Sequence, residues 1–295
     1  MVYTSVAAGL SAALCWGTSD YLSRSQSEKV GYYRTVVYSH IATLAVLLLL
    51  VPIVSPVLEL STLPMLALVA AGALNFIAFI FLYRAFHTGT VSVVAPVAYT
   101  YPAVTTVLSI AILGTSLSAG RILAIAGIIT GVILLSTRFS QLAAHAVSRG
   151  ASTRTSGIGS ALGSSFFFGL VYIAIGYSAP LVSVVLPALT LRAVGVVAGF
   201  LLAPVLHQKV RPTRMAFSRT IMTMGVLEAV GFLSFTYGVS SVGGSLPVVA
   251  ALSGMGGAFA ATYGLVLLKE RLEPNQVVGV LLSLLGVFAL LYLGG

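Results

Sequence analysis

The sequence predicts an all-α integral membrane protein whose ten transmembrane helices form two inverted five-helix repeats. Three observations support this: the composition, the regular spacing of apolar runs, and one helix that occurs twice. Of 295 residues, 58% are hydrophobic and 7% charged, and the mean hydropathy is +1.07. Soluble domains carry roughly 25% charged residues, so this chain cannot cover a surface that faces water. The lipid bilayer is therefore an expected partner.

Ten apolar runs, bounded by charged residues, Gly and Pro, occupy most of the chain. Each is close to the roughly 20 residues that cross a bilayer. The first run lacks the basic start and the cleavage site of a secretory signal, so it counts as a span. The expected spans are roughly 3–23, 33–54, 64–86, 91–114, 119–137, 157–177, 181–205, 217–239, 244–268 and 275–293.

A polar stretch over 138–156, rich in Ser, Ala and Arg, divides the chain into a first repeat, 1–137, and a second, 157–295. Residues 68–86 align with residues 221–239, which places Asn75 on Glu228. Two further alignments place Trp16 on Phe168 and block 112–135 on block 267–290. Because five spans are an odd number, the second copy must enter the membrane from the opposite side, as in many transporters.

The positive charges are distributed unevenly between the two sides of the membrane. Thirteen of the 15 Lys and Arg residues lie in connections after odd-numbered spans, whereas Arg121 is alone on the other side and Arg192 lies within a span. The positive-inside rule therefore predicts a cytoplasmic 138–156 linker and external termini. The net charge of +9 reflects these loops, and without a basic helix outside the spans no nucleic-acid partner is expected.

Glu228 is the strongest candidate for a functional residue. A carboxylate within an apolar span costs a few kcal/mol or more, so it is expected to face the bundle interior. It lies between Gly225 and Gly231, whose spacing permits close helix packing. A role in binding or in proton transfer is one interpretation, and a protonated acid that only bonds to nearby backbone is the other.

Asp20 and Arg192 are further candidates. Asp20 is either a functional carboxylate or a solvated one at the end of the first span. Arg192 pairs with Asp20 or Glu228, binds a substrate carboxylate in bidentate fashion, or extends to the lipid headgroups. His40, near the start of the second span, is expected more as a packing residue than as a functional one.

Spans four and nine are expected to be irregular and to line a cavity. In span four Pro96 and Pro102 flank Tyr99 and Tyr101, and prolines remove helical hydrogen bonds. The matching part of span nine reads AALSGMGGAFA and contains Ser253. Broken helices line cavities in transporters, although such spans also occur for packing alone. On an ideal helix residues 99 and 101 point about 200 degrees apart, so both face one cavity only if the helix is distorted.

The sequence thus predicts a substrate cavity, without a catalytic or metal site and without a cofactor. Cys15 is the only cysteine, and no GxGxxG, HExxH or phosphate-loop motif is present. We therefore do not expect an enzyme. The predicted cavity residues are Trp16, Asp20, Asn75, Tyr99, Tyr101, Arg192, Glu228 and Ser253.

The Trp16-Gly17 pair, the ten spans, the run Leu268 to Arg271 (LKER), and Gln276, Gly279 and Gly286 together resemble the EamA-type branch of the drug/metabolite transporter superfamily. The first half departs from the pattern, because Gly114-Thr115 stands where members often have a glutamate. The resemblance implies a multi-pass carrier in a prokaryotic inner membrane that exports or exchanges small metabolites, often amino acids. Alternatives are proton-coupled multidrug efflux through Glu228 or Asp20, and a membrane enzyme or lipid-handling protein.

Overall fold

The structure, a computed structural model, describes residues 2–54, 60–89, 94, 97–137, 139–140, 157–211, 218–241, 245–259, 263 and 273–293. Pro96, the LKER motif and most of the 138–156 linker lie outside these residues. The described elements are α1 (Val2–Val30), α2 (Tyr32–Val54), α3 (Thr62–Thr88), α5 (Tyr101–Leu113), α6 (Ala119–Ser136), α8 (Ile158–Ser178), the short 3-10 helix η2 (Ala179–Leu181), α9 (Val185–Val205), α10 (Arg219–Ser240), α11 (Leu246–Ser253) and α13 (Pro274–Leu293).

Every regular element in the described ranges is a helix, as expected for a chain whose backbone must satisfy its own hydrogen bonds in lipid. Seven helices in the described part are long and apolar enough to cross a membrane: α2, α3, α6, α8 continued by η2, α9, α10 and α13. Tyr101–Leu113 and Leu246–Phe259 are shorter apolar helices. The structure therefore agrees with the predicted all-α membrane class, while the count of ten spans stays a prediction.

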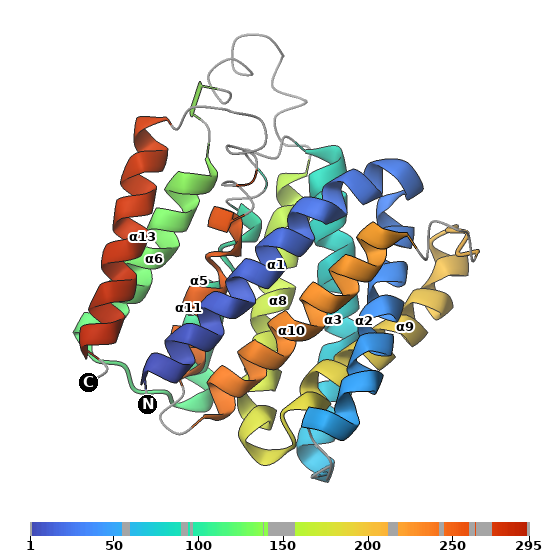
Figure 1. The fold of residues 1–295 in the computed structure, drawn as a ribbon, viewed down its shortest axis with the longest axis horizontal. Coiled ribbons are helices and arrows are strands. Elements are labelled where there is room, and N and C mark those ends of the chain that lie inside the picture. The colour runs from blue at the N-terminus through green and yellow to red at the C-terminus, as the bar shows by residue number, and fades with distance from the viewer. Residues whose placement is uncertain are drawn as a thin grey trace.

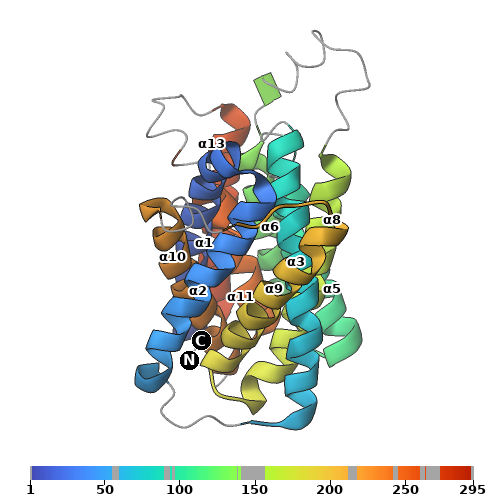
Figure 2. The same ribbon diagram turned by 90° about the vertical axis from the view of Figure 1, so that its right-hand side faces the viewer.

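The helices pack in a pattern that pairs early segments with late ones. α1 lies along α10 and α3 along α8, while α2 packs on α9 and α6 on α13. Figure 1 shows the α6 and α13 pair at one edge of the bundle, with α5 and α11 beside it. Figure 2, turned by 90° so that the opposite side faces the viewer, shows α2, α3 and α9 at the front. Segments separated by half the chain therefore meet in the core.

Chain direction differs between the first helices of the two halves. In Figure 1, α1 starts at the bottom of the bundle and rises, whereas α8 starts at the top and descends. The helices alternate in direction along each half, so α6 ends at the top, on the side where α8 begins.

The first helix is longer than the sequence predicts. It was expected to end near residue 23, but α1 continues to Val30. Asp20 therefore lies inside a helix, where it is 9% exposed, and is not a solvated carboxylate at a helix end. Arg24 and Glu28 form an exposed ion pair at 3.7 Å further along the same helix, so the final turns of α1 carry its water-facing charges.

Both of the spans expected to be irregular are interrupted. Residues 97–98 are helical, Tyr99 and Thr100 form a turn, and α5 begins anew at Tyr101 with Pro102 in its first turn. Proline is tolerated there because the first helical N–H groups have no partner within the helix. In the second half α11 ends at Ser253, and a turn at Gly254 and Met255 precedes the helical residues 256–259.

The two interruptions lie against each other. A Cβ atom added to Gly254 would lie 2.5 Å from Pro102 Cγ, and one added to Gly257 would lie 2.6 Å from the Tyr99 ring. Contacts this short leave no space for a side chain. The bare backbone of the second-half segment thus provides the surface on which the proline and tyrosine of the first half rest.

Candidate functional site

A buried polar cluster cross-links four helices in the centre of the protein. Arg192 of α9 donates from Nη2 to Glu228 Oε2 of α10 at 2.7 Å. Its Nη1 lies 2.9 Å from His40 Nε2 of α2 and donates to Asn75 Oδ1 of α3 at 3.3 Å. Because a guanidinium can only donate, His40 Nε2 must accept, which makes the imidazole neutral. One cation thus joins side chains from α2, α3 and α10.

Two aromatic rings complete the surroundings of this cation. The Arg192 Cζ atom lies 4.8 Å from the ring centre of Phe79 and 4.5 Å from that of Phe232. These distances are within the range of cation–π attraction. Arg192 is 1% exposed and Glu228 3%, so the pair is a buried salt bridge. Two buried charges removed from water need this set of partners to be tolerated.

A cavity lies beside the cluster, on the side of Glu228. Counted as the space open to the centres of water-sized spheres, its volume is about 40 Å³. Roughly 10–15 Å³ suffices for one water, so this space is large enough for a few waters. Its wall is mostly aromatic and is formed by Trp16, Asp20, Phe79, Leu82, Ala98, Tyr99, Tyr101, Phe168, Tyr172, Glu228, Phe232 and Ser253.

Asp20 is the second carboxylate of the wall. Tyr99 OH donates to Asp20 Oδ2 at 2.8 Å. Within the described ranges no lysine, arginine or histidine lies within ion-pair distance of Asp20. The two carboxylates of the cavity therefore differ in their surroundings, because Glu228 has a cation as its partner and Asp20 has a phenol.

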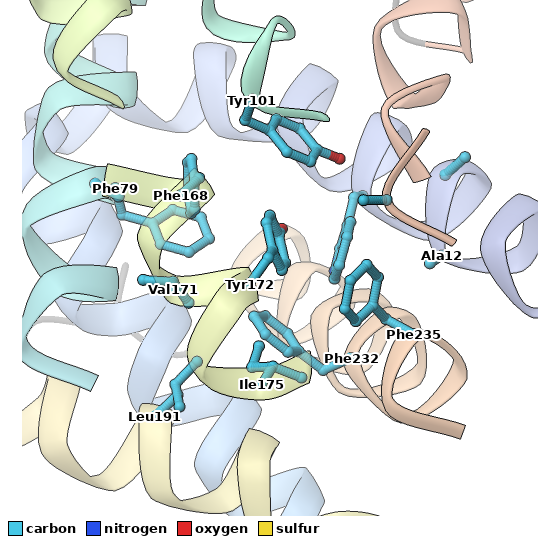
Figure 3. Packing of buried hydrophobic residues seen from close by; sticks show 14 of the residues in the cluster. Ala12, Phe79, Tyr101, Phe168, Val171, Tyr172, Ile175, Leu191, Phe232 and Phe235 are labelled. Carbon is cyan, nitrogen blue, oxygen red and sulfur yellow. The ribbon is translucent and has the colours of Figure 1, made fainter. Parts of the chain in front are cut away.

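The aromatic wall forms one connected cluster. The Tyr172 ring centre is 5.1 Å from that of Tyr101 and 4.8 Å from that of Phe235. Figure 3 shows Tyr172 between these two rings, with Phe79 and Phe168 on the adjacent side. The Phe79 and Phe168 centres are 5.1 Å apart, with ring planes 85° from parallel. Such edge-to-face pairs are favoured over face-to-face stacks, so the wall has a defined shape.

Trp16 closes one side of the cavity, and its position depends on a glycine. A Cβ atom at Gly231 would lie 2.5 Å from the indole Nε1, so there is no space for a side chain at this position of α10. The indole also lies 5.1 Å from Phe232 and 5.9 Å from Tyr172, measured between ring centres. Gly231 thus lets α1 approach α10 closely enough for Trp16 to reach the cavity.

The structure brings six of the eight predicted residues to one cavity: Trp16, Asp20, Tyr99, Tyr101, Glu228 and Ser253. Both tyrosines reach it because the turn at 99–100 changes the direction of the chain between them. Tyr101 OH lies 3.1 Å from Ser253 Oγ. Asn75 and Arg192 are not in the wall and lie behind Glu228 in the polar cluster. Binding of a substrate at any of these residues stays a prediction.

Sequence reasoning missed several residues of this region. His40 was expected to serve mainly in packing, yet it is a hydrogen-bond partner of Arg192. Tyr172 was not predicted, although it lies 152 positions after Asp20, the offset that relates Trp16 to Phe168. Searching the repeat partner of each candidate would therefore have found it.

Comparison with known proteins defines the class as a membrane transporter family. The sequence model of the EamA-like transporter family matches residues 4–137 and again residues 155–292. The chain belongs to the EamA-like transporter family. This confirms the resemblance to the drug/metabolite transporter superfamily, and it favours transport of small solutes over enzymatic catalysis.

Two further proteins are similar to this chain. An uncharacterized protein of Methanocaldococcus jannaschii, MJ1333.1, is 28% identical over 133 residues, which cover 45% of this chain and 96% of the relative. A crystal structure described only as that of a protein has a TM-score of 0.77 and 16% identity, and the match covers 98% of each chain. At this identity the second likeness shows the fold alone.

Proposed function

We propose that this protein is a secondary transporter that moves a small polar or amphipathic metabolite by alternating access around the central cavity. The observation that carries the proposal is a cavity in the bundle core, where two interrupted helices meet and two buried carboxylates face one aromatic wall. Intramembrane carboxylates are costly and usually serve transport. Membership in the EamA-like family supports the same function.

Alternating access requires two structurally similar halves, each of which can adopt the conformation of the other. We propose that these halves are two inverted repeats of five spans, 1–137 and 157–295, joined by the 138–156 linker. The family model matches twice in nearly these ranges. Exchanging the halves also preserves the packing pattern: α5 on α8 corresponds to α11 on α1, and α3 on α9 to α10 on α2.

Side chains near the proposed two-fold axis support the same symmetry. A residue on such an axis must lie beside its own repeat partner. Arg192 contacts His40, and these two residues are 152 positions apart, the offset that relates Trp16 to Phe168. Phe79 and Phe232, which are also repeat partners, lie against the same guanidinium. The axis therefore passes through the polar cluster and the cavity.

The finer assignments follow from the charge distribution and the family. We propose a multi-pass protein of a prokaryotic inner membrane, with the linker and the other odd-numbered connections in the cytoplasm. Export is the proposed direction.

Ligand screening followed by a flux assay tests the proposal. A true substrate should raise the unfolding temperature of the purified protein, because a ligand that binds only the folded state stabilises it. The same compound should then exchange across proteoliposome membranes in counterflow. Glu228→Gln should slow this exchange, whereas Glu28→Gln, on the exposed end of α1, should not. A hit that binds but never crosses the membrane would contradict the carrier function.

Proton-coupled efflux is a second candidate, and Asp20 is the residue that favours it. Glu228 is already paired with Arg192, while Asp20 faces the cavity with Tyr99 as its hydrogen-bond donor. Asp20 has no cationic partner among the residues that the structure describes, which makes it the better proton carrier of the two. Transport that depends on pH in the wild type and no longer does in Asp20→Asn would support it, and an unchanged pH profile would exclude Asp20 as the carrier.

A further inference from the structure

We propose that the cavity selects solutes with a single positive charge, an alkyl- or arylammonium group, and that Asp20 holds this charge. The inference rests on the proposed transport function and names the substrate class of the same cavity. It follows from the charge balance of the cavity, from its aromatic wall, and from the contacts of Arg192, which is the cation beside the cavity among the described residues and is already engaged.

The charge balance leaves one carboxylate without a counter-charge. The described wall contains two acidic side chains, Asp20 and Glu228, and no basic one. Arg192, behind the wall, is bonded to Glu228 at 2.7 Å. These two charges cancel. The carboxylate that remains without a counter-charge is Asp20, which is buried, with an exposed fraction of 9%. A buried carboxylate is stabilised by an opposite charge that arrives with the ligand.

The aromatic wall provides the second element of cation recognition. Tyr99, which donates to Asp20 Oδ2 at 2.8 Å, places a ring next to the carboxylate. Trp16, Tyr101 and Tyr172 belong to the same wall. Faces of Trp and Tyr attract ammonium groups, and aromatic walls are used to recognise quaternary ammonium ligands. A carboxylate among such rings thus favours an ammonium headgroup with an apolar body.

Arg192 is not placed to bind an anionic solute. One of its terminal nitrogens donates to Glu228, and the other contacts His40 and Asn75. Phe79 and Phe232 lie within cation–π distance of its Cζ atom. Bidentate binding of a solute carboxylate would require both nitrogens to leave these partners. Of the roles that the sequence left open for Arg192, these contacts favour pairing with Glu228 over binding a solute carboxylate.

The only tryptophan of the chain makes this inference directly testable. Trp16 is that tryptophan, and it lines the cavity, so its fluorescence reports occupancy without a label. Three probes of similar shape and different charge should be titrated into the purified full-length protein: phenethylamine, phenethyl alcohol and phenylacetate. We expect saturable changes with phenethylamine at an affinity about tenfold or more above that of the other two, a difference of 1.4 kcal/mol.

Two variants on the same helix, α1, test whether Asp20 causes the preference for phenethylamine. Asp20→Asn should abolish the preference for phenethylamine, whereas Glu28→Gln, which removes a charge from the exposed end of α1, should retain it. If Asp20→Asn does not fold, Tyr99→Phe serves instead: it keeps the charge and removes one hydrogen bond, so it should still prefer the amine.

The outcomes separate this inference from the transport function. Tighter binding of phenylacetate or the alcohol, or an amine preference that survives in a folded Asp20→Asn protein, would overturn the cation class and leave the carrier proposal intact. A wild-type protein whose fluorescence responds to none of the three probes would also overturn it. Counterflow of compounds found in the stability screen decides separately whether the protein is a carrier.

Discussion

At the scale of single residues, the guanidinium of Arg192 connects side chains from three other helices. It bonds to Glu228, His40 and Asn75 and lies against two phenylalanine rings. A buried ion pair contributes little net stability compared with well-packed apolar side chains, but removing only one partner leaves an uncompensated charge. Arg192 and Glu228 therefore depend on each other.

We expect Arg192→Met to lower the free energy of unfolding by about 3–5 kcal/mol, because Glu228 is then buried without a partner. The double variant Arg192→Met with Glu228→Met should be more stable than this single variant, because both charges are gone. Denaturant or thermal unfolding of the protein in detergent measures both. Arg121→Met is the control, since Arg121 is half-buried and its side chain makes an exposed hydrogen bond to the Leu293 carbonyl, and it should change stability by about 0.5 kcal/mol or less. A double variant as unstable as the single one would contradict the ion-pair explanation.

At the scale of helices, close approach between α1 and the segment after α11 depends on glycine. A Cβ atom at Gly17 would lie 2.3 Å from the carbonyl oxygen of Gly256 and 2.9 Å from Phe259 Cβ. Since the nearest obstacle is backbone, it cannot be relieved by a side-chain rotation. The Trp16-Gly17 pair of the family resemblance thus has two roles, one in the cavity wall and one in helix packing.

Gly17→Ala should therefore destabilise the protein by about 1–3 kcal/mol or more, as expected for overpacking against a rigid neighbour. The matched control is Gly159→Ala in α8, where nothing lies within 4 Å of an added Cβ atom. There alanine should stabilise by up to about 1 kcal/mol through its helix propensity. Thermal unfolding of the two variants compares them directly, and equal effects would show that the α1 contact is looser than described.

At the scale of the whole molecule, the orientation in the membrane follows from charge. We expect a cysteine at Ser148, in the central linker, to react in intact cells with a membrane-permeant maleimide and not with an impermeant one, because the positive-inside rule places this linker in the cytoplasm. Cys15→Ala supplies the background, since Cys15 is the only native cysteine and is buried. Rapid labelling by the impermeant reagent would reverse the proposed orientation.

The proposed two-fold relation belongs to the same scale. Residues 1–137 and 157–293 should superpose by rotation about an axis in the membrane plane, with Asn75 and Glu228 at equivalent depth. An experimental structure in lipid tests this, and parallel halves or a number of spans other than ten would contradict it.

Much of the site could be predicted from the sequence, because placing a charged side chain in lipid is costly. Glu228 and Arg192 stand out in apolar runs, and the cost of exposing them to lipid required an inward position. Pro102 likewise predicted an interruption of its span, which the turn at Tyr99 and Thr100 shows. The role of His40 was not predicted, although the repeat offset of 152 positions relates it to Arg192. The offset identifies a repeat partner, and only the fold shows that the two side chains are in contact.

The sequence by itself determined the membrane class and the family, because both depend on composition, on the length of apolar runs and on local motifs. Only the tertiary structure decided how the charges are paired. It joins Arg192 to Glu228 and leaves Asp20 to Tyr99, although the sequence left Asp20 and Glu228 equally open as partners. The physical reason is that pairing depends on which faces of α1, α9 and α10 meet, and this is set by close contacts between segments far apart in the chain.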